Sequence, residues 1–229
     1  MRRYALVSLG VLLFCGSAAA QPVPWNVDPA HSSIGFTVKH LAFAKVHGEF
    51  KVFSAKVLAD AKTAKITNLE AEADAKSVDT GVEKRDTHLR SDDFFGADQY
   101  PKLKLVVKSL QWHGKSFTAT GALTIRDVTK NVKFQGEMQG PQVINLGQGP
   151  HMRAAYHATT KINRKEFGLK FAGVAEGIAL VGDEVTIEIE TEISAPLAEA
   201  APAKPNAGTT GAPATPAPVK PNAGTVVPK

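Results

Sequence analysis

Hydrophobic and polar residues alternate with a period of two along most of the chain between residues 25 and 196. In the first such run, Ile34, Phe36, Val38 and His40 fall on one face, and polar or small residues fall on the other. A period of two is typical of a β-strand with one buried face. Comparable runs recur as far as Ile193, and together they predict about eight strands.

The phase of this alternation changes once in the early part of the chain. Val46, Gly48, Phe50 and Val52 share one phase, and the apolar positions from Phe53 onward take the other. An extra residue in one strand of a pair shifts the phase in this way. The pattern therefore predicts a β-bulge at Phe53.

Strands of this number can form two packed sheets or close into one barrel. Closure removes the unpaired edges that invite aggregation. We therefore expect an all-β fold, an eight-stranded antiparallel barrel with a short helix and an apolar interior cavity.

Small residues are frequent at the positions that should face the barrel interior. A barrel of this size holds either packed side chains or one small ligand, so a lining of small residues favours a cavity. The same small residues can instead face large ones such as Phe36 and Phe117 across a filled core, and composition leaves both readings open. The small inward residues are Ala71, Ala73, Ala75, Ala119, Gly121, Gly136, Ala154 and Ala158.

The segment from Ser77 to Pro101 interrupts the strand pattern. Thr80 and Glu83 have the spacing of a capping box, and residues 82–90 then predict a short helix. We expect this helix to cross one mouth of the barrel. Phe94 and Phe95 follow it and are expected to shield the interior from water.

Both ends of the chain differ from the middle. Residues 1–20 carry Arg2 and Arg3, a short apolar run and an Ala-rich cleavage pattern, which predict a signal peptide and a mature chain starting at Gln21. Cys15 is the only cysteine, so the mature chain has no disulfide and no thiolate metal site. Residues 21–196 form the predicted domain. Residues 197–229 are rich in Ala, Pro and Lys, which predicts a disordered tail.

The net charge of +5 comes from the two ends of the chain. The arginines of the leader and three lysines after residue 200 account for all of it. An electroneutral domain lacks the basic face that phosphate backbones require, which argues against a nucleic-acid partner. The basic tail is either an extension without function or a peripheral tether to the anionic cell envelope.

Motifs for catalysis or metal binding are weak. Asp79-Thr80-Gly81 matches the aspartic-protease triplet, but only one copy is present and the mechanism needs two aspartates. The seven histidines show no H-E-x-x-H spacing, so no metal site is predicted. His40 ends an inward row and either contacts a ligand head group or is a hydrogen-bonded structural residue. Arg85, His88 and Arg90 either meet a head group or pin the helix to the barrel.

Short blocks in a fixed order, spanning nearly all of residues 26–193, resemble the YceI family of secreted polyisoprenoid-binding proteins. Asp127 and Asn131 depart from the family pattern, both in a surface turn. The resemblance implies a lipocalin-like barrel in the bacterial periplasm that holds an isoprenoid or similar lipid chain. The blocks include Asp28-Pro29-Ala30-His31-Ser32, Gly48-Glu49-Phe50, Ser77-Val78-Asp79-Thr80, Arg85 to Ser91, Phe94-Phe95, Tyr100-Pro101, Val128-Thr129-Lys130, Phe167-Gly168-Leu169 and Val181 to Val185.

A chain in the interior should contact the inward residues of several strands. We expect a non-catalytic carrier of a polyprenyl or quinone-like lipid without any cofactor. An enzyme acting on such a lipid and a stress-related interaction protein with a filled barrel are the alternatives, and the oligomeric state stays open, with a dimer possible. The expected ligand-binding residues are Phe36, Val38, His40, Phe50, Ala71, Ala73, Leu105, Phe117, Ala119, Phe134, Tyr156 and Ile187.

Overall fold

The computed structural model describes residues 22–147 and 149–197. The predicted signal peptide and tail lie outside these residues and stay predictions. Within the described ranges, no helix has the length and apolar composition needed to cross a membrane.

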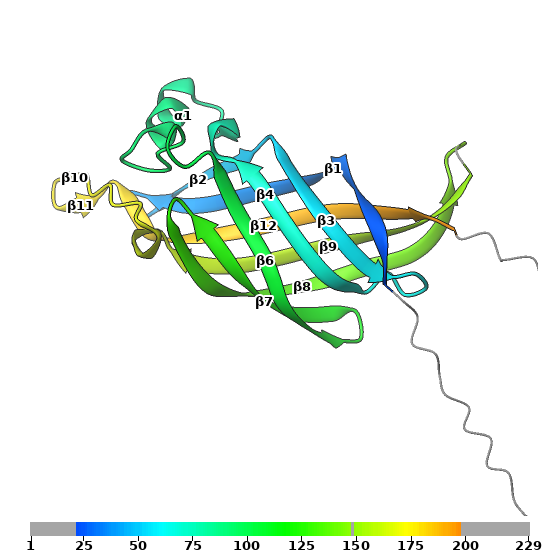
Figure 1. Ribbon diagram of the computed structural model, residues 1–229. Coiled ribbons are helices and arrows are strands. Elements are labelled where there is room, and N and C mark those ends of the chain that lie inside the picture. Colours follow the sequence, from blue (N-terminus) through cyan, green and yellow to red (C-terminus); the bar gives the residue numbers. More distant parts are fainter. Residues whose placement is uncertain (1–21, 148, 198–229) are drawn as a thin grey trace, which may run out of the picture. The chain divides into compact units, whose positions relative to one another are not determined.

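Eight antiparallel strands form a closed barrel (Figure 1). The wall runs in the order β12, β9, β8, β7, β6, β4, β3 and β1, and pairing of β1 with β12 closes it. The predicted lipocalin-like barrel is confirmed. The wall strands are β1 (Pro22–His40), β3 (Phe53–Asp60), β4 (Ile66–Asp74), β6 (Lys102–His113), β7 (Ser116–Ile125), β8 (Val128–Asn145), β9 (Pro150–Asn163) and β12 (Val181–Pro196).

Shorter elements surround one end of the barrel. Strand β2 (Ala44–Phe50) continues the wall beside the second half of β1, and β5 (Val78–Asp79) pairs with β2. The helix α1 (Glu83–Arg90) lies at this end (Figure 1). The remaining elements are two 3-10 turns, η1 (Ala75–Ser77) and η2 (Arg164–Phe167), and a small hairpin of β10 (Val174–Ala175) and β11 (Ile178–Ala179).

The phase change at Phe53 is not a β-bulge, as the sequence analysis expected, but a break between two strands. Strand β2 ends at Phe50 and β3 starts at Phe53. Lys51 and Val52 leave the ladder, because their amides donate to Ser77 instead, one to its carbonyl and the other to its hydroxyl. The break lets one stretch of chain pair with β1 on one side and with β4 on the other.

The capping box at the start of α1 is also wrong. Val82 is the N-cap, and its side chain makes no capping hydrogen bond. The Thr80 hydroxyl donates to the buried carboxylate of Asp86 in the first turn, and the Thr80 amide donates to the same oxygen at 2.9 Å. Asp86 therefore anchors the residues before the helix, a role that the spacing of Thr80 and Glu83 concealed.

Some of the small inward residues make room for large neighbours. A Cβ at Gly136 would lie 2.4 Å from Cζ of Phe117, and a Cβ at Gly121 would lie 2.8 Å from a methyl group of Leu105. The filled-core reading is correct at these two positions. The space inside the barrel therefore has to be located from the cavities themselves.

Candidate functional site

Two cavities of the described residues follow one another along the barrel interior. We call the one at the α1 end the upper cavity and the other the lower cavity. The upper cavity, beneath α1, has a volume of about 540 Å³. The lower cavity lies among the middle strands and has a volume of about 90 Å³. The first falls within the range of pockets that hold small molecules.

The upper cavity has apolar walls drawn from three parts of the chain. Phe36 and Ile187 come from paired positions of β1 and β12. Leu89 comes from α1, and Phe94 and Phe95 come from the loop that follows it. The expectation that Phe94 and Phe95 shield the interior is met, because both side chains are buried against the cavity.

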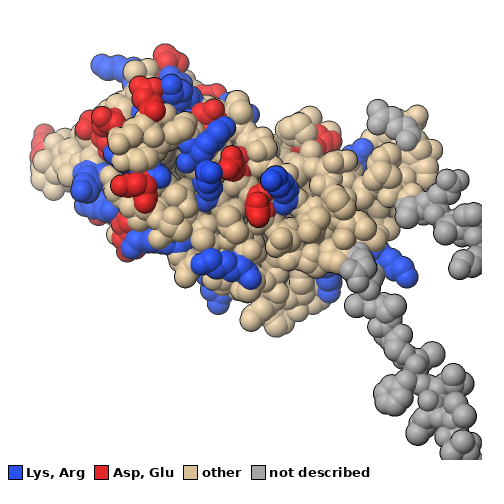
Figure 2. Space-filling view, in the orientation of Figure 1, with Lys and Arg blue, Asp and Glu red and all other residues tan. Residues whose placement is uncertain are grey.

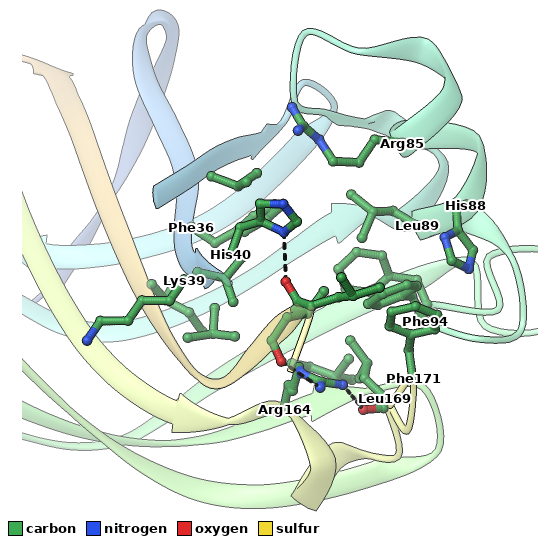
Figure 3. Close-up of a pocket in the computed structure, with 18 of the residues that line it drawn as sticks. Phe36, Lys39, His40, Arg85, His88, Leu89, Phe94, Arg164, Leu169 and Phe171 are labelled. Carbon is green, nitrogen blue, oxygen red and sulfur yellow. Dashed lines mark hydrogen bonds between the residues drawn. The ribbon is translucent and has the colours of Figure 1, made fainter. Parts of the chain in front are cut away.

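The loop from Gly168 to Leu180 supplies the other side of the mouth. Phe171 lies in this loop and packs against His88 and Phe94 with ring centroids 5.0 and 5.1 Å apart (Figure 3). His88 also packs edge-on against Phe94. These three rings close the gap between the helix and the loop.

Arg164 holds the base of that loop in place. Its side chain is only 4% exposed. Its guanidinium donates to the carbonyls of Leu169 and Val181 (Figure 3). It also donates to the Gly182 carbonyl and pairs with Asp183 at 3.1 Å. Burial lowers the pKa of Arg164, and the charge of Asp183 opposes that shift. An arginine stays charged even so, so it is a fixed cation in the wall.

Basic side chains dominate the polar part of the upper cavity. Among the described residues, those lining this cavity include six basic side chains and no aspartate or glutamate. In Figure 3, Arg85 and His40 lie at the mouth, whereas Lys39 extends away from them. The six are Lys39, His40, Lys84, Arg85, His88 and Arg164.

His40 makes the hydrogen bond of a structural residue and also lies where a ligand head group could reach it. Its Nδ1 donates to the Leu180 carbonyl at 2.7 Å (Figure 3). A carbonyl oxygen only accepts, so Nδ1 carries the proton and Nε2 is left to meet another polar group. His40 also lines the upper cavity.

The cluster of Arg85, His88 and Arg90 is mainly structural. Arg85 donates to the hydroxyl and the carbonyl of Thr80, and Arg90 donates to the carbonyls of Lys76 and Val78. His88 pairs with Asp93 at 2.8 Å. These bonds pin α1 to the barrel, although Arg85 and His88 also line the cavity and Arg90 does not.

The structure divides the twelve residues expected to contact a ligand between the two cavities. Five line the upper cavity, namely Phe36, Val38, His40, Phe50 and Ile187. Six line the lower cavity, namely Ala71, Leu105, Phe117, Ala119, Phe134 and Tyr156. Ala73 is buried and lines neither of these two cavities, so its contact with a ligand stays a prediction.

The end of the barrel away from α1 is closed by the turn between β3 and β4. Ala64 of this turn is fully buried, and its carbonyl accepts a hydrogen bond from the Tyr156 hydroxyl. The Trp112 indole donates to the Ile66 carbonyl at 3.3 Å. Burial also raises the pKa of Tyr156 well above its usual value, which keeps the hydroxyl protonated as the donor.

Removing the Tyr156 hydroxyl should destabilise this closed end. In Tyr156→Phe the Ala64 carbonyl loses its partner while buried, and an orphaned buried group costs about 1–3 kcal/mol of unfolding free energy. Urea unfolding measures this loss. Tyr100→Phe, whose ring packs against Arg126, is the control and should match the wild type. Equal midpoints for all three proteins would show that the Tyr156 hydroxyl contributes nothing.

A separate polar cluster lies on the outside of the barrel where β1 meets β12. Asp28, His31 and Glu192 each present one atom within 4.8 Å of the others. Arg153 already pairs with both carboxylates. The cluster therefore carries its own compensating cation.

Asp28 and His31 should titrate as a pair. Their hydrogen bond is the largest cause both of a lowered pKa of Asp28 and of a raised pKa of His31. Because the pKa of Asp28 is lowered, its contribution to stability is present at pH values above the ordinary aspartate pKa. Because the pKa of His31 is raised, its contribution is present at pH values below the ordinary histidine pKa. The pair therefore stabilises the fold most between about pH 4 and 6.5. His31 is largely exposed, which keeps this contribution small.

A proton NMR titration should give His31 a pKa above the ordinary histidine value of 6.5. In Asp28→Asn the pKa of His31 should return to the ordinary value. An unchanged titration curve of His31 in that variant would contradict the pairing.

Four cavity-lining residues that the sequence analysis missed come from η2 and the loop that follows it. Arg164, Leu169, Phe171 and Leu180 lie outside the alternating runs that it used. The sequence offers one signal for these residues, namely that Arg164 stands directly after a predicted strand and shortly before Phe167-Gly168-Leu169.

Comparison with known proteins identifies the family. The model of the YceI-like domain matches residues 25–193. A UPF0312 protein of Staphylococcus aureus is 34% identical over 171 residues, which cover 74% of this chain and 96% of that protein.

Solved structures agree with this relationship. The YCEI protein of Campylobacter jejuni superposes with a TM-score of 0.59 at 25% identity, over 85% of this chain and 99% of that one. A polyisoprenoid binding domain from Saccharophagus degradans has a TM-score of 0.55 at 15% identity, over 75% of this chain and 98% of that one, and shares the fold. The chain belongs to the family of YceI-like domains.

Proposed function

We propose that this protein binds and carries one polyisoprenoid or quinone-like lipid in its barrel, without chemical turnover, in the periplasm. The observation that carries the proposal is the apolar cavity of about 540 Å³ beneath α1. Membership of the YceI-like family supports it, as does the shared fold with the polyisoprenoid binding domain of Saccharophagus degradans. The pattern of residues 1–20 supports the periplasmic location.

The energetics of chain burial favour a ligand of several isoprene units. Each methylene-sized group moved out of water contributes about 0.8 kcal/mol. Association costs about 4–15 kcal/mol, so roughly ten or more buried carbons are needed before binding becomes appreciable. A cavity with apolar walls under a helix can bury such a chain.

The head group is expected at the mouth, next to the basic side chains. Nε2 of His40 is available there, and Arg85 lies on the opposite side of the opening (Figure 3). A ligand oxygen between them can accept a hydrogen bond from the guanidinium. A polar head in this position leaves the apolar chain to point into the barrel.

Native mass spectrometry after gentle purification of the secreted protein tests the proposal. A carrier should retain one lipid mass per chain, and extraction should identify a prenyl or similar apolar chain. A protein that takes up neither its own lipid nor added geranylgeraniol would refute the proposal and favour an interaction protein with a filled barrel. If the bound lipid is converted to a product in solution, the protein is an enzyme instead.

A further inference from the structure

Strand β1 changes its partner part-way along its length. Residues Pro22–Trp25 pair with β3, and residues Gly35–His40 pair with β2. In the described chain, no strand pairing joins residues 26–34 of β1 to residues 53–56 of β3. We call this interval the β1–β3 seam. Figure 1 shows the start of β1 beside β3 and its later part diverging from it.

Hydrogen bonds on both sides keep the seam apart. On one side, the Lys51 and Val52 amides donate to Ser77, and the Asp74 amide donates to the Val52 carbonyl at 2.8 Å. These bonds draw the β2–β3 connection toward β4 and β5 and away from β1. The hydrogen bonds that separate β2 from β3 therefore also hold the start of β3 away from β1.

On the other side, β1 has an irregularity between Asp28 and Ser33 where its register against β12 shifts. The Ala30 amide donates to the Asp28 side chain at 2.9 Å, and the Ser32 hydroxyl donates to the Asp28 carbonyl at 2.6 Å. The Glu192 amide of β12 donates to the Ser32 hydroxyl at 3.2 Å. This part of β1 is held to β12 and to itself, and it leaves the edge facing β3 unpaired.

The lower cavity reaches the seam from the inside. Its walls include both edges of the seam together with interior residues such as Leu105 and Phe117. The residues from the edges are Val27, Ser32, Ser33 and Ile34 of β1 and Phe53, Ser54 and Ala55 of β3. Its volume of about 90 Å³ exceeds the need of a single water, and apolar cavities on the order of 150 Å³ stay dry and accept apolar ligands.

The surface near this end of the barrel carries few charged side chains (Figure 2). In Figure 2, charged side chains gather over α1 and the adjoining strand ends, whereas the surface toward the opposite end is largely uncharged. Ile34 and Phe53, on the two edges of the seam, are only partly buried and belong to the apolar set packed against the core.

We infer that the β1–β3 seam is a lateral exit for the tail of a linear alkyl or prenyl chain whose head lies at the α1 mouth. The inference rests on the proposed function. Beyond the lower cavity, the barrel is closed by Ala64, Tyr156 and Trp112, so a chain that reaches this cavity and is longer than the interior has to turn. The seam is the place where the lower cavity meets an unpaired stretch of wall. Ligands longer than the barrel therefore bind with their tail ends outside it.

A fluorescence-quenching experiment locates the tail. A bimane is attached at Ser54→Cys, an exposed position of the seam, in the full chain with Cys15 replaced by Ser. The probe ligand is stearic acid carrying a nitroxide either at the tail end or beside the carboxyl group. Ser109→Cys, exposed on β6, carries the label in the matched control. We expect loss of emission only with the tail-end nitroxide and only at residue 54.

Electron paramagnetic resonance on the same samples distinguishes a failure of the proposed function from a failure of the lateral-exit inference. Nitroxide spectra that remain those of free ligand would mean that the alkyl chain does not bind, which overturns the inference; if geranylgeraniol is not taken up either, the proposed function itself is wrong. An immobilised nitroxide without quenching at residue 54 would show a bound chain that does not reach the seam, which overturns the inference alone.

A second variant tests the seam without a label. Ala55→Trp adds a large ring to the edge of β3 that lines the lower cavity. We expect weaker binding of long prenols and unchanged binding of geraniol, which is short enough to stay in the upper cavity. Equal losses for both ligands, or no loss for either, would contradict a lateral exit.

Discussion

Arg164→Leu should lower the free energy of unfolding by about 3–5 kcal/mol. Three backbone carbonyls lose their donor, and each buried carbonyl without a partner costs about 1–3 kcal/mol. Asp183 also loses the cation that it pairs with. Urea unfolding of the two proteins measures the difference.

The same substitution should release the loop that forms one side of the mouth. Leu169 and Val181, two of the carbonyl acceptors, flank Phe171 and the β10–β11 hairpin. Faster amide hydrogen exchange in residues 168–180 reports that release. Lys165→Met is the matched control, because Lys165 pairs with the same Asp183 but is exposed, and a surface pair is worth less than about 1 kcal/mol. Equal stability of the two variants would contradict the role given to Arg164.

Val38→Trp should abolish most lipid binding while leaving the barrel folded. Val38 lines the upper cavity and lies opposite Val185 in the β1–β12 ladder. The indole occupies space that the chain would fill, and excluding four or five methylene groups costs about 3–4 kcal/mol, or more than about 100-fold in affinity. Titration with geranylgeraniol measures the loss.

The control for this variant is a tryptophan on the outside of the same wall. Lys133 is exposed on β8, so Lys133→Trp adds the same side chain without entering the cavity. Its affinity should equal that of the wild type. If Val38→Trp binds the lipid as tightly as Lys133→Trp, the chain does not lie in the upper cavity.

The barrel could be predicted from the sequence because alternation reports directly on which side chains face the interior. Ile34, Phe36 and Val38 are paired in the wall with Ile189, Ile187 and Val185, which the same period marks as inward. The helix was predictable to within a residue, since α1 spans Glu83–Arg90. Local periodicity therefore gave both the strand faces and the one interruption of the strand pattern.

The location of the cavity could not be predicted in the same way. Small inward residues suggested the free space, but two of them accommodate Phe117 and Leu105. The larger cavity is instead lined by large residues, including Phe36 and Phe50, because α1 and the loop of Phe171 extend the walls beyond the strands. How far a loop stands from a barrel mouth depends on tertiary contacts such as those of Arg164, which alternation does not encode.

The central claim is that an apolar chain lies inside the barrel beneath α1. Intermolecular NOEs between bound geranylgeraniol and the methyl groups of the protein test it most directly. The account predicts NOEs to Ile187 and Leu103 of the upper cavity. NOEs confined to exposed methyl groups, such as those of Val174 and Leu146, would contradict it.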